Sequence, residues 1–324
     1  MTTSLTAPEF TNEAAAIAHL EASRWPQDYV NCPHCGSINV MRMGGKTQAG
    51  MWLCRDCRDK FTARTGTVME RSHIPVHKWL LAIHLMNSSK KGFSAHQLHR
   101  TLGVTYKSAW FLAHRIREAM KDHVGPKAPP LGGEGKVVEA DELYYGERET
   151  KRVSQKRTTP YTKKGKGANK RVILGLVERG GKVRTFDIDA ATTAEIAYVV
   201  RTNVSRDSNL QTDEAGVYTK LGTEFKGGHH TVIHSGKEYV RREVDRLVTT
   251  NTIENVFSVF KRGMRGVYQH CGESHLHRYL AEFDFRYNRR SALGINDNER
   301  AAAALKGIAG KRLTYRRPDQ AKNA

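Results

Sequence analysis

Residues 136–145 read Lys-Val-Val-Glu-Ala-Asp-Glu-Leu-Tyr-Tyr, a short apolar run that also carries three acids. The apolar residues and their flanks predict a β-strand. A strand that only supports a fold would carry valine or threonine where this one carries Asp141, because a carboxylate costs free energy when it leaves water. The stretch therefore predicts both a sheet and a functional acid within it.

The residues that follow this strand predict the rest of a mixed sheet. Further strands are expected at 171–178, 182–189, 209–213 and 231–234. Gly180 and Gly181 predict a hairpin between the first two of them. Thr192 and Glu195 have the spacing of a capping box at the start of a helix. The order of strands and helices predicts an α/β, RNase H-like catalytic domain with a mixed sheet at 137–292.

Upstream of the sheet, four of the five cysteines form two Cys-x-x-Cys pairs, with 18 residues between the pairs. The four are Cys32, Cys35, Cys54 and Cys57. Two such pairs can supply four thiolates to one Zn²⁺ ion, and a shell closed in this way leaves no open position for catalysis. The alternative is four ordinary thiols. We predict a zinc ribbon with a structural ion at 25–70, preceded by a helical segment at 1–24.

A small helical domain is expected between the ribbon and the sheet. Ser94 can cap a helix that Gly103 ends, and the next helix carries an apolar stripe. The stripe consists of Ala109, Leu112, Ala113, Ile116 and Met120. This pattern predicts a helix-turn-helix at 71–124, followed by a linker at 125–136. A small bundle with a solvated basic face would show the same stripe.

Basic residues of this helical domain are candidates for contacts with DNA. They are Lys107, Arg115, His114 and Lys121, all expected to project outward from the second helix of the motif.

The charge of the chain points to a polyanion as its partner. Lysine and arginine outnumber the acids by 53 − 33 = 20 among 324 residues, and such a surplus favours nucleic acid, here DNA. No apolar run is long enough to span a bilayer, and the N-terminus lacks the features of a secretory signal. We therefore expect no membrane partner and a cytoplasmic location.

Two segments carry much of this positive charge. Residues 151–171 hold nine lysines or arginines and no acid, a composition typical of a solvated loop. They belong to a predicted basic insertion at 146–171, where Lys163 and Lys164 are expected to contact phosphates beside the acidic strand. Residues 293–324 are expected to form a basic C-terminal tail.

Two further acids complete a candidate metal site. Asp213 ends a short strand, so its carboxylate can lie near that of Asp141, and neighbouring carboxylates repel each other unless a cation lies between them. Oxygen ligands of this kind select Mg²⁺ or Mn²⁺. Glu254 lies on a helix whose apolar stripe leaves it on the same face as Lys261, where Lys261 and Arg262 can reach the DNA backbone. An ordinary solvated helix face would also show this pair.

Together these motifs resemble those of the bacterial insertion-sequence transposases of the DDE type that carry an N-terminal zinc ribbon and helix-turn-helix. The resemblance extends from about Trp25 to Ser291. The segments that carry it are Cys-Pro-His-Cys-Gly-Ser (32–37), Phe-Thr-Ala-Arg-Thr-Gly-Thr-Val-Met (61–69), Lys-Lys-Gly-Phe-Ser-Ala-His-Gln-Leu (90–98), Ala-Trp-Phe-Leu-Ala-His-Arg-Ile-Arg-Glu-Ala-Met (109–120), Glu-Ala-Asp-Glu (139–142), Asn-Thr-Ile-Glu-Asn (251–255) and Glu-Phe-Asp-Phe-Arg-Tyr-Asn (282–288).

The resemblance implies a DNA transposase that cleaves transposon ends and joins them to target DNA. It implies two Mg²⁺ ions, for which Mn²⁺ can substitute, held by Asp141, Asp213 and Glu254. It also implies terminal inverted repeats and target DNA as partners, with a homo-oligomer assembled on the DNA.

The chain departs from the family pattern where Thr249 precedes Thr250, since relatives commonly have histidine there. Family members also vary at the third acidic position, so Asn255 stays an alternative to Glu254.

Two other functions are compatible with parts of the sequence. A non-catalytic zinc-ribbon and helix-turn-helix regulator would bind DNA but would not need the three acids together. Another RNase H-like nuclease, acting on RNA–DNA hybrids or junctions, would not need the appended DNA-binding modules. Cys271 and the histidines 229, 230 and 234 lack the spacing of metal ligands, and no metal is assigned to them.

Overall fold

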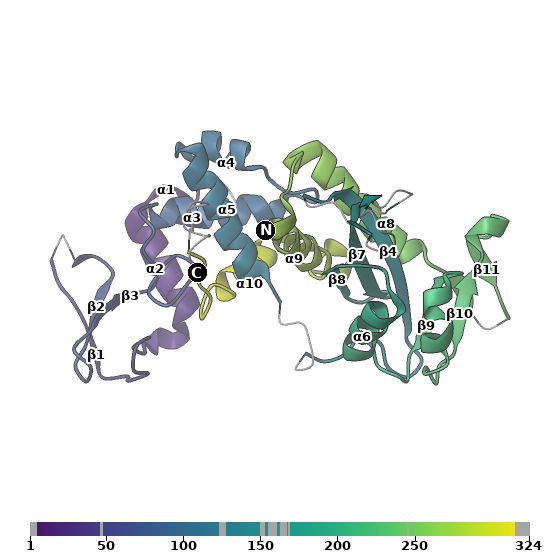
Figure 1. Ribbon diagram of the computed structural model, residues 1–324. Helices are drawn as coiled ribbons and strands as arrows, with labels where there is room; N and C mark the ends of the chain where they lie inside the picture. The colour runs from purple at the N-terminus through teal and green to yellow at the C-terminus, as the bar shows by residue number, and fades with distance from the viewer. Residues whose placement is uncertain are drawn as a thin grey trace. The chain divides into compact units, whose positions relative to one another are not determined.

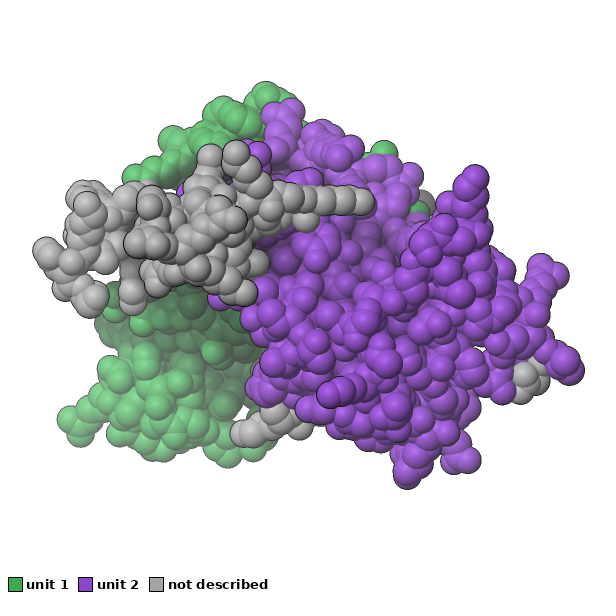
Figure 2. Space-filling model, turned by 45° about the vertical axis from the view of Figure 1, so that its right-hand side comes forward, with its two compact units in different colours: residues 1–121, 289–324 green, residues 122–288 purple. Residues whose placement is uncertain are grey.

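The structure is a computed structural model, and it describes residues 5–45, 48–122, 128–149, 153–154, 161–162, 167, 169–244 and 246–314. The chain forms two compact units (Figures 1 and 2). The first unit contains Met1–Lys121 and Arg289–Ala324, and the second contains Asp122–Asn288. The C-terminal segment therefore belongs with the N-terminal residues rather than with the sheet domain that precedes it.

The first unit combines helices with a small antiparallel sheet. Its helices are α1 (Pro8–Thr11), α2 (Glu13–Arg24), α3 (Val76–Ser88), α4 (Ala95–Leu102), α5 (Tyr106–Met120) and α10 (Asp297–Lys306). Its sheet, in the order β1-β2-β3, consists of β1 (Val40–Arg42), β2 (Met51–Cys54) and β3 (Lys60–Thr62). Trp52 and Phe61 each form an edge-to-face contact with Trp25, which follows α2 and is buried.

Helices α4 and α5 form the predicted helix–turn–helix arrangement. Ser94 caps α4 in a complete capping box with Gln97, and Gly103 ends α4 with φ 60° and ψ 42°, in the left-handed region that glycine adopts without strain. Thr105 then caps α5. The apolar stripe that was predicted for α5 is buried, so the local prediction of two helices and their turn is confirmed.

The expectation that His114 projects outward is wrong, because its side chain is fully buried. The Trp110 ring packs on the imidazole, with ring centroids 4.1 Å apart, and α5 as a whole is also contacted by helix α10 of the C-terminal segment. Beyond α10, Lys311 Nζ donates hydrogen bonds to the carbonyls of Ala119 (3.1 Å) and Lys121 (2.6 Å) at the end of α5. A second face of α5 is therefore covered, and periodicity within α5 alone could not reveal this.

The prediction that residues 293–324 form only a basic tail needs the same correction. Asn296 and Glu299 form a complete capping box at the start of α10, which packs against α3. Ala304, Leu305 and Ile308 are buried. Residues 315–324 lie outside the described residues, so the tail prediction for them is not addressed.

The second unit is organised around a five-stranded mixed sheet in the order β10-β9-β4-β7-β8. The strands are β4 (Val137–Glu147), β7 (Lys170–Glu178), β8 (Val183–Ile188), β9 (Asn209–Asp213) and β10 (His229–Val232). The first three form an antiparallel meander, whereas β9 runs parallel to β4 and β10 runs parallel to β9. In chain order the sheet is 5-4-1-2-3, which is the RNase H-like topology predicted from the sequence.

Helices cover both faces of this sheet. Helix α6 (Thr193–Asn203) packs on one face, with α7 (Thr219–Gly222) nearby, and α8 (Asn251–Gly263) and α9 (Leu276–Tyr287) pack on the other. Ala140 belongs to the core under α6, whereas Leu143 belongs to the core under α8. Because side chains alternate along a strand, Glu139 and Asp141 face the α8 side with Leu143.

Three smaller features complete the second unit. Strands β11 (Val240–Arg242) and β12 (Leu247–Thr249) form a hairpin that was not predicted, and β5 (Val153–Ser154) pairs with β6 (Tyr161–Thr162). Thr192 caps α6 as expected, but Glu195 accepts from the Ala190 N–H, so the predicted capping box is only half formed.

Among the described helices, none has the length and apolar character needed to cross a membrane.

Candidate active site and zinc ribbon

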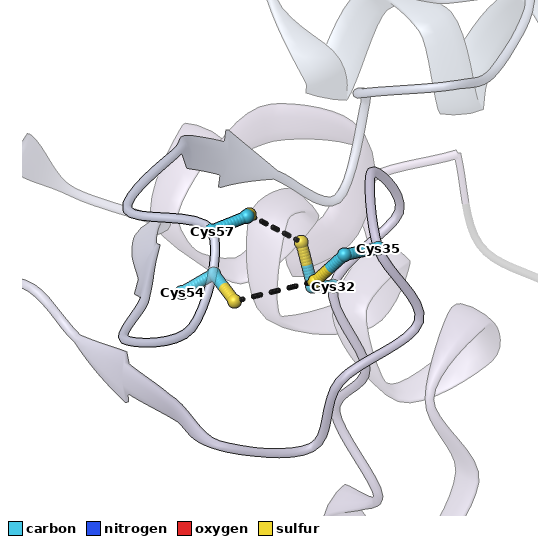
Figure 3. A group of neighbouring side chains, drawn as sticks. All are labelled: Cys32, Cys35, Cys54 and Cys57. Carbon is cyan, nitrogen blue, oxygen red and sulfur yellow. Dashed lines mark hydrogen bonds between the residues drawn. The ribbon is translucent and has the colours of Figure 1, made fainter.

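The four paired cysteines converge at the end of the small sheet in the first unit (Figure 3). All four sulfur atoms lie within 4.8 Å of one another, with Cys32 Sγ 3.7 Å from Cys57 Sγ and Cys35 Sγ 3.6 Å from Cys54 Sγ. Zn–S bonds of about 2.3 Å in a tetrahedron place sulfur atoms about 3.8 Å apart. The four thiols therefore have the spacing of a closed structural zinc site.

The thiols of the cluster differ in acidity: although each accepts a backbone hydrogen bond, burial and the neighbouring thiols raise the pKa values of Cys35 and Cys57, as expected for four sulfur atoms close together without a cation. Hydrogen bonds from backbone N–H groups, first that of Cys57, lower the pKa of the Cys54 thiol to about 7. His34 is exposed, and its backbone N–H donates to Cys32 Sγ at 3.4 Å. The imidazole of His34 is not needed to complete a shell of four sulfur ligands.

In the second unit, the strand register brings two of the predicted acids together. The parallel pair β4 and β9 aligns Val137 with Asn209 and Glu139 with Gln211. Two residues beyond this last aligned pair come Asp141 on β4 and Asp213 at the end of β9, and Asp213 lies close enough for its charge to raise the pKa of Asp141. The two aspartates thus lie close together on neighbouring interior strands of the sheet, as the sequence predicted.

Helix α8 brings the third acid, Glu254, close to Asp141. Asp141 is paired across β4 and β7 with Gly175, over which Ile253 and Phe257 of α8 pack. A Cβ atom on Gly175 would lie 2.6 Å from Ile253 Cδ1, so glycine permits the close approach of the helix. Glu254, in the first turn of α8, faces the same pocket as Asp141.

That pocket has a volume of about 510 Å³ and combines acids with a basic rim. Asp141, Glu142 and Glu254 line it, together with His234 and Ser258. Its remaining polar lining residues are Lys261, Arg262 and Arg265, all exposed on or just after α8. Asn255 is exposed and does not line the pocket.

Two neighbouring acids of the pocket, Asp141 and Glu142, have raised pKa values. Burial, followed by the negative charge of Glu142 and then those of Asp213 and Glu254, raises the pKa of Asp141 to about 7. Burial and the charge of Asp213 raise the pKa of Glu142 to about 7 as well, although Tyr218 donates a hydrogen bond to it. Among the described residues, no lysine or arginine forms an ion pair with Asp141 or Asp213.

This donor set fits a hard divalent cation, which would offset the unpaired negative charge through carboxylate oxygens. The type of ligand atom suits such a cation, but the distances between the carboxylates are longer than in a formed metal site. Within the described part of the chain, the oxygens of the three acids do not all approach within 4.8 Å of one another, as the four thiols do.

Three residues at the pocket were not assigned a role from the sequence. Glu142 adjoins Asp141, Arg265 lies one helical turn beyond Lys261, and His234 follows β10. His234 Nε2 lies 3.5 Å from Glu254 Oε1 and 3.3 Å from Thr250 Oγ1. Helical spacing from Lys261 could have identified Arg265, whereas the position of His234 depends on how the sheet places β10.

The predicted DNA-binding residues outside the pocket differ in exposure. Lys107 is exposed in the first turn of α5. Arg115 is partly buried, stacks 4.6 Å from the Phe111 ring centroid and donates from Nε to the Leu313 carbonyl at 3.2 Å. Lys163 and Lys164 lie outside the described residues.

Comparison with known proteins gives matches over both units. Residues 130–288 match the ISXO2-like transposase domain, and residues 11–60 match the transposase zinc-ribbon domain. We had expected these domains at 137–292 and 25–70. An uncharacterized protein in the transposable element ISH50 of Halobacterium salinarum is 29% identical over 286 residues, covering 86% of this chain and 91% of that protein.

Two solved structures are weakly similar to this chain. A chain in the intasome of simian T-cell lymphotropic virus, in complex with PP2A regulatory subunit B56 gamma, is 12% identical with a TM-score of 0.29. The match covers 58% of this chain and 63% of that one, which is less than two thirds of its length. The Mos1 strand transfer complex is 10% identical with a TM-score of 0.20, covering 66% and 73%. At these scores neither likeness bears on function.

The two family models match separate parts of the chain, in the order that the sequence motifs predicted. The catalytic-domain match covers the sheet with its three acids, so a regulator without a catalytic domain is not favoured. The chain belongs to the ISXO2-like insertion-sequence DNA transposases that carry an N-terminal zinc ribbon.

Proposed function

We propose that this transposase cleaves the ends of its element and transfers them to target DNA with Asp141, Asp213 and Glu254 as its catalytic acids. One observation carries the proposal: Asp141 and Glu254 line one pocket, and Asp213 on the neighbouring strand lies close enough to Asp141 to raise its pKa. Such a strongly perturbed acid in a cleft is typical of a functional site.

The three acids would hold Mg²⁺, for which Mn²⁺ can substitute. When bound, two such ions supply a nucleophile from water or a 3′-hydroxyl and stabilise the leaving oxygen of the displacement. Glu254 is favoured over Asn255 as the third ligand, because Glu254 faces the pocket and carries the charge that a divalent cation prefers.

The basic rim would hold the DNA. Lys261, Arg262 and Arg265 are exposed beside the acids, where they can bind the phosphates that flank the scissile bond. Lys107 and Arg115, with Lys163 and Lys164 of the basic insertion, would add phosphate contacts. The zinc ribbon and the helix-turn-helix would recognise the terminal inverted repeats, and a homo-oligomer in the cytoplasm would bring two ends and the target together.

The test is a cleavage reaction with the full chain, Mg²⁺ and DNA that flanks the gene, followed by mapping of the cut sites. We expect cuts at the element's ends with the parent protein and none with Asp141→Ala or Asp213→Ala, although both variants bind the DNA in a gel shift. Normal cleavage by either variant would remove that residue from the proposed site.

A further inference from the structure

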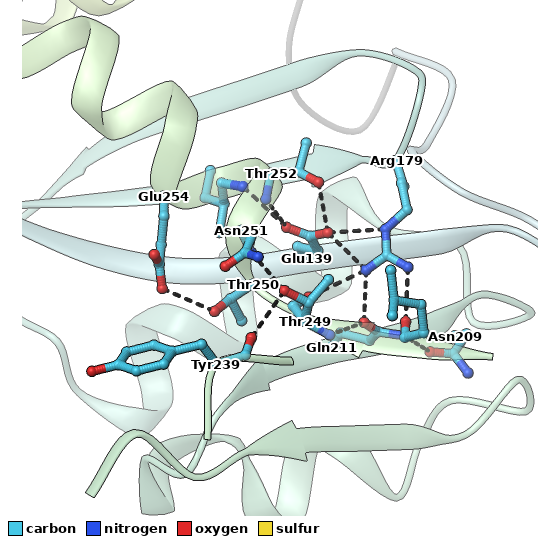
Figure 4. Close-up of polar contacts among 12 residues, drawn as sticks. Glu139, Arg179, Asn209, Gln211, Tyr239, Thr249, Thr250, Asn251, Thr252 and Glu254 are labelled. Atoms are coloured by element: carbon cyan, nitrogen blue, oxygen red, sulfur yellow. Dashed lines mark hydrogen bonds and ion pairs between the residues drawn. The ribbon is translucent and has the colours of Figure 1, made fainter. Parts of the chain in front are cut away.

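A largely buried polar layer lies one step before the three acids, and Figure 4 shows its residues together with Glu254. Its members precede the acids by two residues each: Glu139 before Asp141 on β4, Gln211 before Asp213 on β9, and Thr252 before Glu254 on α8. Glu139 and Gln211 are paired in the β4–β9 register and are fully buried. Residues two apart on a strand share a face, so this layer and the two aspartates form consecutive steps of one surface.

Glu139 anchors the start of α8. Its Oε2 accepts hydrogen bonds from the backbone N–H groups of Thr252 (2.8 Å) and Ile253 (3.0 Å), and its Oε1 accepts one from Thr252 Oγ1 (2.8 Å). These N–H groups belong to the first turn of the helix, where they have no partner within the helix. A negative charge there also interacts favourably with the helix dipole. Glu139 thereby fixes the turn that carries Glu254.

Arg179, which follows β7, connects Glu139 to the neighbouring strand. Its Nε and Nη2 donate to Glu139 Oε1 at 3.0 and 2.8 Å, and Nη2 also donates to Gln211 Oε1 at 2.8 Å. The same guanidinium donates to the carbonyls of Leu247 (2.9 Å) and Thr249 (3.2 Å) in β12. Gln211 Oε1 accepts a further bond from the Thr249 N–H at 2.9 Å.

Stability alone does not explain why charged residues occupy this layer. Well-packed apolar residues often stabilise a fold as well as a buried ion pair does, because the ion pair must be desolvated. Hydrogen bonds depend on orientation, unlike apolar contacts. Those of the layer join β4, β9 and α8, the three elements that carry the acids, and so orient these elements relative to one another. Groups that orient metal ligands in this way commonly change metal affinity when they are replaced.

We propose that Glu139, Arg179 and Gln211 are positioning residues that set the separation of Asp141, Asp213 and Glu254 and so determine the affinity for the divalent cation. This inference rests on the proposed role of the three acids. Glu139, Arg179 and Gln211 need not touch metal or DNA themselves.

The test uses Mn²⁺ binding by the full chain, measured by calorimetry, beside its thermal unfolding and its Mg²⁺-dependent DNA cleavage. We expect Glu139→Gln, which keeps the shape but removes the charge, to weaken Mn²⁺ binding about tenfold or more. Cleavage at fixed Mg²⁺ should fall with it and recover in part as the Mg²⁺ concentration is raised, while gel-shift affinity stays at the parent level.

Glu282→Gln is the matched control. Glu282 is also fully buried and ion-paired, with Arg286 on α9 in the same unit, but it lies outside the polar layer. It should lower thermal stability without changing Mn²⁺ affinity. Equal losses of affinity in the two variants, or parent-like affinity in Glu139→Gln, would overturn the positioning role.

A milder variant covers the case in which Glu139→Gln does not fold. Arg179→Lys keeps the charge but cannot reach Glu139, Gln211 and the two carbonyls together, so it should also weaken Mn²⁺ binding, and parent-like binding would again overturn the inference. Asp141→Asn separates this inference from the proposed function. If the parent binds Mn²⁺ and Asp141→Asn does not, the acids keep their role whatever Glu139 does; a parent without Mn²⁺ binding overturns both.

Discussion

At the scale of single residues, the acids of the pocket are placed where they destabilise the metal-free protein. Asp141 lies in the middle of a buried strand beside Glu142, Asp213 and Glu254, and no described lysine or arginine pairs with it. Folding thus brings together charges that the unfolded chain keeps apart in water. A divalent cation would remove this cost, so cation binding and stability should be linked.

Asp141→Asn should therefore stabilise the protein in the presence of EDTA at pH 8. The pKa of Asp141 is raised from 3.8 to about 7, so the folded state binds its proton more tightly than the unfolded state. Below about pH 4 both states are protonated and the residue contributes nothing. Between about pH 4 and 7 the free energy of unfolding of the parent protein falls by on the order of 4 kcal/mol, whereas that of Asp141→Asn lacks this fall. Denaturant unfolding of both proteins from pH 4 to 8 measures this, and a less stable variant at pH 8 would contradict it.

Glu254→Gln and Asn255→Ala should separate the two candidates for the third ligand. A helical step of one residue turns the side chain by about 100°, so the two cannot face the same metal. Glu254 faces the pocket and Asn255 is exposed. We expect Glu254→Gln to lose nearly all Mg²⁺-dependent cleavage and Asn255→Ala to keep a substantial fraction, measured on one pre-bound substrate. An active Glu254→Gln beside an inactive Asn255→Ala would reverse the assignment.

At the scale of elements, the approach of α8 to the sheet depends on one small residue. Gly175 of β7 lies under α8, and a Cβ atom there would lie 2.6 Å from Ile253 Cδ1 and 2.8 Å from Phe257 Cζ. The helix carries Glu254, so any displacement of α8 would also move the third acid. Packing at Gly175 and catalysis at Glu254 should therefore respond together.

Gly175→Val should destabilise the protein by about 1–3 kcal/mol, because added volume in a packed core forces side chains or backbone to move. It should also slow cleavage more than it weakens DNA binding. Gly216→Ala is the control, since a Cβ atom at Gly216 meets nothing within 4 Å. Denaturant unfolding and single-turnover cleavage measure both effects. Gly175→Val with the parent's stability and rate would show that α8 tolerates the added volume.

The elements also show what the sequence could predict. Strand β9 lies at the predicted residues 209–213. The nearness of the two aspartates could be predicted, since each lies on a short strand of the expected sheet. The contact of Arg179 with Glu139 and Gln211 could not, because it depends on strand register and on an unpredicted hairpin. Helix α10 was missed although Asn296 and Glu299 have capping-box spacing.

At the scale of the whole molecule, the chain divides its tasks between two units. The first unit contains the zinc ribbon and the helix-turn-helix, and its helical part is completed by α10 from the far end of the chain. The second unit contains the sheet and the acids. Since each unit has its own core, damage to the ribbon should leave the catalytic domain folded.

Cys54→Ser should release zinc and weaken binding to the element's ends while the second unit stays folded. The ribbon's sheet is short, with strands of three or four residues, so much of its folding free energy must come from the metal. Serine cannot replace a thiolate ligand, and three sulfur atoms would leave the shell open.

Cys271→Ser is the matched control, because Cys271 lies in the second unit, outside the four-cysteine cluster. The parent and Cys271→Ser should each contain about one zinc per chain, and Cys54→Ser should contain almost none. Gel shifts should then show weaker specific end binding for Cys54→Ser alone, while Mn²⁺ still stabilises its second unit against thermal unfolding. A parent without zinc would contradict the ribbon site, and loss of the Mn²⁺ response in Cys54→Ser would show that the two units do not fold independently.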